Sequence, residues 1–463
     1  MAWVEALDVL PRLLSERIGA EISGARLFVS LLYVYPIAII QRVVLHGANA
    51  NLHHIYNTIT SALLLHFNFG SDSIYFLANI LAAYVILRTF KSSRLAVISS
   101  IILNLGFLGY AYLIDTAPKT AVTWTAPHCV LTLKLIGVQW DVYDGAQQDV
   151  KGKEETAIAS VPSLLELLGF SYYPASMMTG PQISFRKYRL FTDGQFNEDI
   201  GSSWRYAMQR LTIGIVLVVA FPLLSPYIPT QYFYTQEFKS QWLVLKVVTV
   251  AIWGQVVLLK YLGVWLVAEG SCIFSGMAYN GKDAQGIIQW DQCANVKVNR
   301  YFTATQTQHF IDSFNINTNK WVLTYVYKRL RFLNNKNISQ GVSLVFLAGW
   351  HGFSSGYFMC FLLEFLIVNG EKAVVKLCSK KAALKSLVNH PLLTLPSTLM
   401  SKLLATFALS YALISFELHS YNLYMEIYAD LLYAVHIGYA LAPLLCTVLS
   451  AMLTDDSPKT KST

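Results

Sequence analysis

The sequence predicts an all-α polytopic membrane protein, and three observations carry that prediction. Hydrophobic residues occupy 54% of the 463 positions and charged residues only 13%, whereas an ordinary soluble domain has about 25% charged residues. Mean hydropathy is +0.44. The apolar residues gather in runs close to the length of about 20 residues that an α-helix needs to cross a bilayer. Length alone would allow two or three soluble domains, and the composition argues against them.

The first 20 residues predict an amphipathic helix that lies on the membrane surface. Its apolar residues recur at three- and four-residue spacing; they are Trp3, Val4, Leu7, Leu10, Leu13 and Leu14. The segment contains acidic residues and lacks a cationic stretch followed by a clean apolar core. It therefore does not resemble a cleaved signal peptide.

Seven apolar runs are clear candidates for spanning helices. They are Leu27–Leu45, Ser73–Arg88, Leu95–Ile114, Leu211–Ile228, Trp242–Val267, Leu399–Phe416 and Tyr428–Leu453. Shorter or more polar candidates are Leu52–Phe67, Thr123–Val138 and Leu164–Met178, and the split stretch Ile338–Val368 adds one or two. The sequence thus predicts one transmembrane domain over residues 1–463 with roughly ten or eleven spans. Several spans contain proline, so tilted and broken helices are expected.

Basic loops on both sides of Ile338–Val368 bear on its topology. Lysine and arginine precede it at residues 328–336 and lysines follow it at residues 372–385. Positive loops favour the cytosolic side. If both flanks are cytosolic, the stretch is re-entrant or a pair of short tilted helices broken near Gly349–Gly356. One long tilted helix is the alternative, with one flank breaking the rule.

Charge and cysteine usage narrow the function classes. The net charge of +8 is typical of positive loops facing anionic lipid in a membrane protein, so no nucleic-acid partner is expected. The six cysteines show neither a CxxC pair nor a regular spacing, which argues against a zinc site and a disulfide framework. No HExxH motif, carboxylate cluster or P-loop occurs, so no metal site and no cofactor are predicted.

The segment Phe314–Tyr357 carries the strongest functional signal. It opens with FNINTNKWVLTYVYKRL and continues, from Ile338, with ISQGVSLVFLAGWHGFSSGY. His351 therefore lies between apolar arms long enough to sit in a bilayer. An ionisable residue at such a position is costly unless it is solvated, paired or used, and is a functional candidate by default.

These residues resemble the signature of the membrane-bound O-acyltransferase family, in its lysophospholipid acyltransferase branch. The likeness continues in VPSLLELLGFSYYPASMMTGPQ from Val161, WLVAEGSCIFSGMAYNG from Trp265 and QWDQCANVKV from Gln289. It covers at least residues 161–369. The subgroup most similar to this sequence loads polyunsaturated acyl chains onto lysophosphatidylcholine.

The resemblance implies a catalytic chamber among the helices and an acyltransferase of the EC 2.3.1 class. The acyl group would pass from acyl-CoA, a substrate, to the sn-2 hydroxyl of lysophosphatidylcholine, with lysophosphatidylethanolamine and lysophosphatidylserine as further acceptors. His351 matches the catalytic histidine, whose ordinary pKa suits a general base near neutral pH. Asn315 matches the conserved asparagine. It would either fix the imidazole tautomer or donate to the developing oxyanion, while N-capping of a helix is its structural alternative.

Other residues are weaker candidates for substrate contact. Trp290 and Asp291 match a WD element of the branch, and Tyr357 and His436 are candidates for lining the chamber. Lys328 and Arg329, with Arg331, are candidates for meeting the coenzyme phosphates. Solvated or lipid-facing side chains are the alternative for the basic residues, and packing is the alternative for His436.

The C-terminal lysines bear on the location of the protein. Lys459 and Lys461 in the cytosolic tail 455–463 resemble a dilysine signal for retrieval to the endoplasmic reticulum membrane. Large apolar surfaces are compatible with a homodimer. The rival functions are acylation of a protein or another lipid within the same family, and a transporter with a midplane histidine. The transporter would move solute without turning over acyl-CoA.

Overall fold

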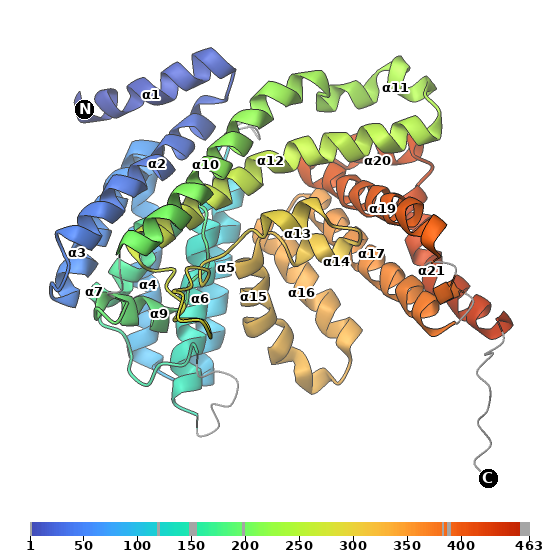
Figure 1. The fold of residues 1–463 in the computed structure, drawn as a ribbon. Helices are drawn as coiled ribbons and strands as arrows, with labels where there is room; N and C mark the ends of the chain where they lie inside the picture. The colour runs from blue at the N-terminus through green and yellow to red at the C-terminus, as the bar shows by residue number, and fades with distance from the viewer. Residues whose placement is uncertain are drawn as a thin grey trace, which may run out of the picture. The chain divides into compact units, whose positions relative to one another are not determined.

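The structure is a computed structural model that describes residues 2–117, 121–147, 155–196, 200–381, 384–386 and 390–453. The predicted tail signal at Lys459 and Lys461 lies outside the described residues. Apart from a single isolated bridge between Lys282 and Ile288, the elements of the described part are helices (Figure 1). The prediction of an all-α membrane protein is confirmed.

The chain forms two compact units that interleave along the sequence. The first unit contains Met1–Leu223, Leu259–Val296 and Asn315–Phe332, and the second contains Leu224–Leu258, Lys297–Phe314 and Leu333–Thr463.

The helices of the first unit come mostly from the N-terminal half of the chain. They are α1 (Ala2–Ile18), α2 (Ile22–Val43), α3 (Ala50–Phe69), η1 (Gly70–Ser73), α4 (Ile74–Phe90), α5 (Arg94–Ile114), α6 (Thr125–Gly145), α7 (Leu164–Ser171), α8 (Pro174–Met177), α9 (Phe185–Thr192), α10 (Ile200–Leu224), α15 (Ile316–Tyr325) and η4 (Tyr327–Leu333). The long helix α12 (Leu243–Ser275) adds its C-terminal part.

The second unit is built around the C-terminal helices. They are α16 (Lys336–His351), α17 (Ser355–Lys380), α19 (Pro391–Leu418), α20 (Tyr421–Asp430) and α21 (Ala434–Met452), with α17 packed against α16, α19 and α21. Shorter elements are η2 (Ser225–Tyr227), η3 (Thr230–Tyr234), α11 (Gln236–Ser240), α13 (Val298–Phe302) and α14 (Thr307–Ile311).

Within the described residues, seven helical stretches are long and apolar enough to cross a membrane. They are Ile22–Val43, Ala50–Phe90, Arg94–Ile114, Ser202–Tyr234, Leu243–Ser275, Pro391–Leu418 and Ala434–Met452. All seven clear candidates from the sequence overlap these stretches. The last one begins at Ala434 rather than Tyr428, because Leu432 and Tyr433 have φ of 54° and 51°, a left-handed conformation that a helix cannot contain.

Two weaker candidates are core elements of the first unit. Leu164–Met178 is not a span, because it divides into the short helices α7 and α8. A capping box between Ser163 and Glu166 starts α7, as the S-x-x-E pattern dictates. The Thr123–Val138 candidate forms α6, most of whose residues are buried.

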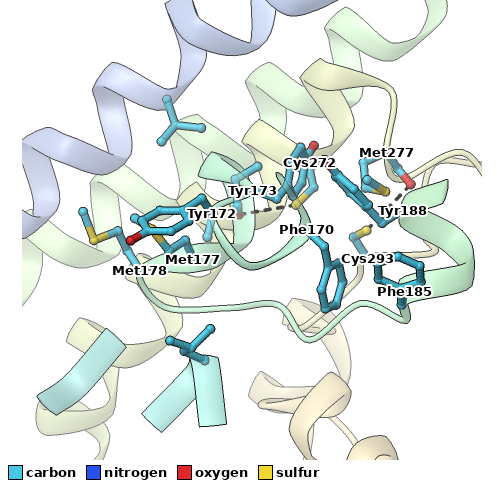
Figure 2. Packing of buried hydrophobic residues seen from close by; sticks show 14 of the residues in the cluster. Phe170, Tyr172, Tyr173, Met177, Met178, Phe185, Tyr188, Cys272, Met277 and Cys293 are labelled. Atoms are coloured by element: carbon cyan, nitrogen blue, oxygen red, sulfur yellow. Dashed lines mark hydrogen bonds between the residues drawn. The ribbon is translucent and has the colours of Figure 1, made fainter. Parts of the chain in front are cut away.

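The core of the first unit is rich in aromatic rings and sulfur. Figure 2 shows part of it, where Phe170, Tyr173 and Tyr188 pack near Cys272 and Cys293. The ring of Tyr188 meets Phe170 edge-on at 5.6 Å between centroids. All six cysteines are free thiols, and the two in this core act as small apolar side chains.

The N-terminal helix is anchored by a polar contact. Asp8 is 2% exposed and accepts hydrogen bonds from Arg26 of α2 and from Arg12. These arginines lower the pKa of Asp8 to about 2. Leu10 and Leu13 on the same helix are exposed, so two of the apolar positions predicted to face the membrane surface are left uncovered by the protein.

Candidate functional site

His351 is the last residue of α16, and the helix ends there because of the glycine that follows. Gly352 has φ 136° and ψ 179°, a backbone conformation open to glycine and strained for other residues. Its N–H still donates to the carbonyl of Ala348. The next helix begins at Ser355, after Ser354 has accepted a hydrogen bond from the N–H of Gly356. The stretch is therefore a pair of helices broken at Gly352, which excludes the alternative of one long helix.

Aromatic rings surround the imidazole of His351. Phe361 stacks on it with centroids 5.7 Å apart, Phe416 meets it edge-on at 5.1 Å, and Tyr357 is tilted against it at 5.4 Å. Trp350 adds an edge contact at 4.6 Å. Within the described residues, neither ring nitrogen of His351 makes a hydrogen bond. The ring plane is thus fixed by packing, and both nitrogens remain available to a substrate.

Asn315 occupies the N-cap position of α15 without acting as a side-chain cap. Its backbone is left-handed, with φ 50° and ψ 33°, and its side chain makes no capping hydrogen bond. The N–H of Asn319 donates to the Asn315 carbonyl. Asparagine is one of the few residues that adopts this conformation readily. The backbone therefore explains an asparagine here, while the carboxamide is not used for capping. Asn315 belongs to the first unit and His351 to the second.

A cavity of about 530 Å³ lies in the first unit beside α15. Its walls are α6, α9, the loop around Tyr279 and α15, with Asn317 and Lys320 on the α15 side. Four basic side chains line it, which are Lys134, Arg186, Lys187 and Lys320, against the two acidic residues Asp141 and Glu155. The balance of charge in the cavity is positive, which favours an anionic ligand.

Two of these lysines, one buried and one half-buried, are bound only to neutral acceptors. Lys134 is 2% exposed, and its Nζ donates to Ser176 Oγ at 2.8 Å and to the carbonyl of Phe170 at 3.2 Å. Lys187 Nζ donates to the carbonyl of Tyr279 at 2.8 Å and lies over the Phe196 ring. Burial lowers the pKa of Lys187. Neither ammonium pairs with a carboxylate among the described residues, so a bound anion would supply the missing countercharge.

The WD element supports the loop that follows α12. Trp290 is buried, donates from Nε1 to Ser202 Oγ at 3.3 Å and has the guanidinium of Arg42 over its ring. Asp291 accepts a hydrogen bond from Asn280 at 2.8 Å. These contacts give both residues a structural role in the first unit.

Lys328 and Arg329 differ in their surroundings although they are neighbours. The guanidinium of Arg329 donates to Asp144 at 2.8 Å and lies 4.0 Å from the centre of the Trp140 ring. This buried pairing occupies Arg329 within the protein. Lys328 is exposed in η4.

His436 lies near the start of α21 among tyrosines. Its Nδ1 shares a hydrogen bond of 2.8 Å with the hydroxyl of Tyr411, and its ring meets Tyr428 edge-on at 4.9 Å. Nε2 is buried and has no partner in the described part of the chain. Tyr357, the other predicted lining residue, contacts the rings of His351 and His419.

Lys134, Lys187 and Glu269 are not among the site residues predicted from the sequence. A lysine inside the apolar run from Cys129 to Val138 and a glutamate inside WLVAEGSC are the available signals, because charges in apolar stretches are costly. Glu269 does pair with a basic residue, Arg210 of α10, at 2.9 Å.

Comparison with known proteins identifies the class. The family model described as "MBOAT, membrane-bound O-acyltransferase family" matches residues 110–414, which include Asn315 and His351. The chain belongs to the membrane-bound O-acyltransferase family, and it is accordingly a multi-pass membrane enzyme that transfers acyl groups.

Curated relatives extend over nearly the whole chain. The protein named lysophospholipid acyltransferase 5 of Mus musculus is 37% identical over 443 residues, which cover 94% of this chain and 91% of that protein. The protein of the same name from Drosophila melanogaster is 36% identical, over 78% of this chain and 74% of its own length. That of Caenorhabditis elegans is 30% identical, over 88% and 87%.

Proposed function

We propose that this enzyme transfers a polyunsaturated acyl group from acyl-CoA to the sn-2 hydroxyl of a lysophospholipid. Lysophosphatidylcholine is the preferred acceptor in this proposal, with lysophosphatidylethanolamine and lysophosphatidylserine as further acceptors. The observation that carries the proposal is the similarity, over 94% of the chain, to a protein named lysophospholipid acyltransferase 5. Phospholipid remodelling in the endoplasmic reticulum is the setting that this activity suggests.

His351 acts as the general base in the proposed reaction. It takes the proton of the acceptor hydroxyl while that oxygen attacks the thioester carbonyl of the donor. The tetrahedral intermediate then collapses, the carbon–sulfur bond breaks, and the coenzyme A thiolate receives a proton from the imidazolium. The unbonded nitrogens of His351 support this role, because a base needs a free lone pair to accept the proton.

Asn315 assists this step by one of two routes. It stabilises the oxyanion by donating a hydrogen bond from its carboxamide, or it binds the second imidazole nitrogen and fixes the tautomer. The absence of a side-chain capping bond at Asn315 supports both routes, because the carboxamide is not engaged by its own helix.

The cavity beside α15 is our candidate site for the coenzyme phosphates. Acyl-CoA carries several negative phosphate oxygens, and buried Lys134 and half-buried Lys187 offer ammonium groups that have no carboxylate partner among the described residues. Lysine is a common phosphate ligand in proteins. Lys328 and Arg329 are weaker candidates, because Lys328 is exposed and Arg329 is bound to Asp144.

The test is coenzyme A release by the purified protein in detergent. Arachidonoyl-CoA would be supplied with each lysophospholipid headgroup in turn, and with no acceptor as the background. Release that depends on a lysophospholipid, highest with lysophosphatidylcholine, is expected. If no lysophospholipid is acylated, the proposal fails, and protein acceptors followed by solute flux become the next measurements.

A further inference from the structure

We propose that Glu269 is a positioning residue for Asn315, acting through a turn at residues 293–296 and through Asn317. This inference rests on the proposed function, because it gives Asn315 a part in the reaction. All the residues involved belong to the first unit. A series of hydrogen bonds connects the buried carboxylate to the start of α15.

Glu269 is a buried carboxylate whose two oxygens have different partners. The side chain is on α12 and is 1% exposed. Oε1 pairs with the guanidinium of Arg210 at 2.9 Å. Oε2 accepts the backbone N–H groups of Asn295 and Val296, at 3.0 and 3.3 Å. The carboxylate of Glu269 therefore joins α12 to two successive backbone N–H groups of the 293–296 turn.

The 293–296 turn holds the first residues of α15. The side-chain Oδ1 of Asn295 accepts the backbone N–H of Asn317 at 3.0 Å, and the Asn295 carbonyl accepts that of Ile316 at 3.3 Å. The carboxamide of Asn317 donates back to the carbonyl of Ala294 at 2.9 Å. The backbone on the C-terminal side of Asn315 is therefore bound in both directions to one short turn.

These contacts replace the missing cap of α15. The first N–H groups of a helix need partners from outside it, and Asn315 supplies none from its side chain. Asn295 accepts from two of those groups, those of Ile316 and Asn317. The backbone next to Asn315 is thus held by Asn295, which lies 20 positions earlier, and Asn295 is held in turn by the carboxylate of Glu269.

Replacement of Glu269 by glutamine would break this arrangement with almost no change in volume. A glutamine has one oxygen and one NH₂ group, whereas Arg210 on one side and two N–H groups on the other are all donors. The NH₂ group of the glutamine would therefore face either Arg210 or the N–H groups of the turn, where the carboxylate offers an acceptor. A shift of about 1 Å in a catalytic group can cost about 100-fold in rate, so a displaced turn is sufficient to impair Asn315.

The experiment is a double-mutant cycle on coenzyme A release, with Glu269→Gln, Asn315→Ala and the double variant measured beside the wild type. We expect Glu269→Gln to lower kcat by about 10- to 100-fold with the KM of donor and acceptor unchanged. In the Asn315→Ala background, the same change should cost less than about 3-fold, because residues that act through one another are non-additive. Glu269→Asp, which keeps the charge, should restore part of kcat.

Glu371→Gln is the matched control. Glu371 also holds a turn by accepting the backbone N–H of Thr307 at 2.8 Å and the Thr307 hydroxyl, and it lies in the second unit. It should leave kcat within about 2-fold, since it acts on a turn with no part in the proposed reaction. Thermal unfolding of every variant identifies those that fail to fold. For any that fail, Asn317→Asp, which removes the donations to the turn, replaces Glu269→Gln in the cycle.

Two results would overturn the inference. Full additivity of Glu269→Gln with Asn315→Ala would mean that Glu269 acts independently of Asn315, and so would an unchanged kcat in a folded Glu269→Gln protein. Failure of the proposed function has a different signature, in which Asn315→Ala itself retains wild-type turnover or the wild type does not release coenzyme A.

Discussion

Asn315 and His351 are held in place by different kinds of contact. The backbone next to Asn315 is fixed by hydrogen bonds. The N–H of Asn317 donates to the Asn295 side chain, and the Asn317 carboxamide donates to the carbonyl of Ala294 in the 293–296 turn. The ring of His351 is surrounded by those of Trp350, Tyr357, Phe361 and Phe416, and neither of its nitrogens makes a hydrogen bond among the described residues. In the proposed reaction, Asn315 donates a hydrogen bond in a fixed direction, which a rigid backbone favours. His351 gains and loses a proton, which requires a ring nitrogen that has no hydrogen-bond partner in the protein.

The largest effect is expected at His351. His351→Asn retains a polar side chain of smaller size but cannot serve as a base, so kcat should fall by about 10²- to 10⁴-fold, measured as coenzyme A release. His390→Asn is the control, because His390 is exposed and accepts the N–H of Leu392 as a helix cap, a role that asparagine fills well. Undiminished turnover in a folded His351→Asn protein would remove His351 from the mechanism.

The next effect separates the two routes for Asn315. Asn315→Ala should lower kcat by about 10²- to 10³-fold if the carboxamide donates to the oxyanion. Asn315→Asp should then be at least as impaired, because a carboxylate repels the developing charge. The pH profile of kcat decides between the routes. We expect it to keep its shape in Asn315→Ala, and a displaced profile would indicate that Asn315 acts on the imidazole instead.

A third effect should appear in binding rather than in turnover. Replacing Lys187 by methionine is expected to raise the KM of the donor by about 10- to 100-fold, the value of a hydrogen bond to a charged group, with kcat unchanged. Lys328→Met is the comparison, since exposed Lys328 is one of the weaker candidates that the sequence offers for the phosphates; it should leave the KM of the donor nearly unchanged. Equal effects of the two variants would count against the cavity as the phosphate site.

The pH dependence of the donor KM follows from the same lysine. Burial lowers the pKa of Lys187, so its charge is present at low pH and is lost as pH rises through that lowered value. The donor KM of the wild type should therefore begin to rise at a lower pH than an ordinary lysine would cause. Lys187→Arg should abolish the rise, because a guanidinium stays charged throughout this range. A rise that persists in Lys187→Arg would assign it to another group.

The smallest effect tests the ring contacts of His351. Phe361→Leu removes the stacked ring but keeps an apolar side chain, and the loss of about 0.5–1.5 kcal/mol for such a pair predicts a decrease in kcat of about 2- to 10-fold. Phe365→Leu, on the same helix, is the control and should have less effect. If Phe361→Leu were as damaging as Asn315→Ala, the distinction between packed and hydrogen-bonded positioning would not hold.

More of the fold than of the candidate site could be predicted from the sequence. Apolar runs identified all seven stretches that can cross a membrane, because a bilayer imposes length and composition directly on the chain. The prediction of a span at Leu164–Met178 was wrong, because hydropathy does not distinguish a membrane span from short buried helices. The break at Gly352 was foreseen as one of several topologies, and the positive φ decided among them.

Residues of the proposed site can be named from the sequence where they lie in a motif, but not where only tertiary contacts bring them together. His351 and Asn315 stand out in WHG and FNINTN. The pairing of Arg329 with Asp144, 185 positions apart in the chain, has no sequence signature, so Arg329 looked free. Lys187 lies in the mixed polar and aromatic segment FRKYRL, which carries no sign of a site, and only the tertiary structure places it against the carbonyl of Tyr279.

The Arg210–Glu269 ion pair has a consequence for biosynthesis. A lone carboxylate in an apolar helix opposes transfer into the bilayer, by about 2.5–3.5 kcal/mol near its centre. Arg210 is on α10 and Glu269 on α12, and these helices approach closely at Gly214 and Gly263. We expect the two helices to enter the lipid together, with the charge of Glu269 neutralised by Arg210. In a translocon insertion assay, Arg210→Gln should then reduce the integration of α12, whereas Arg205→Gln, five residues earlier on α10, should not.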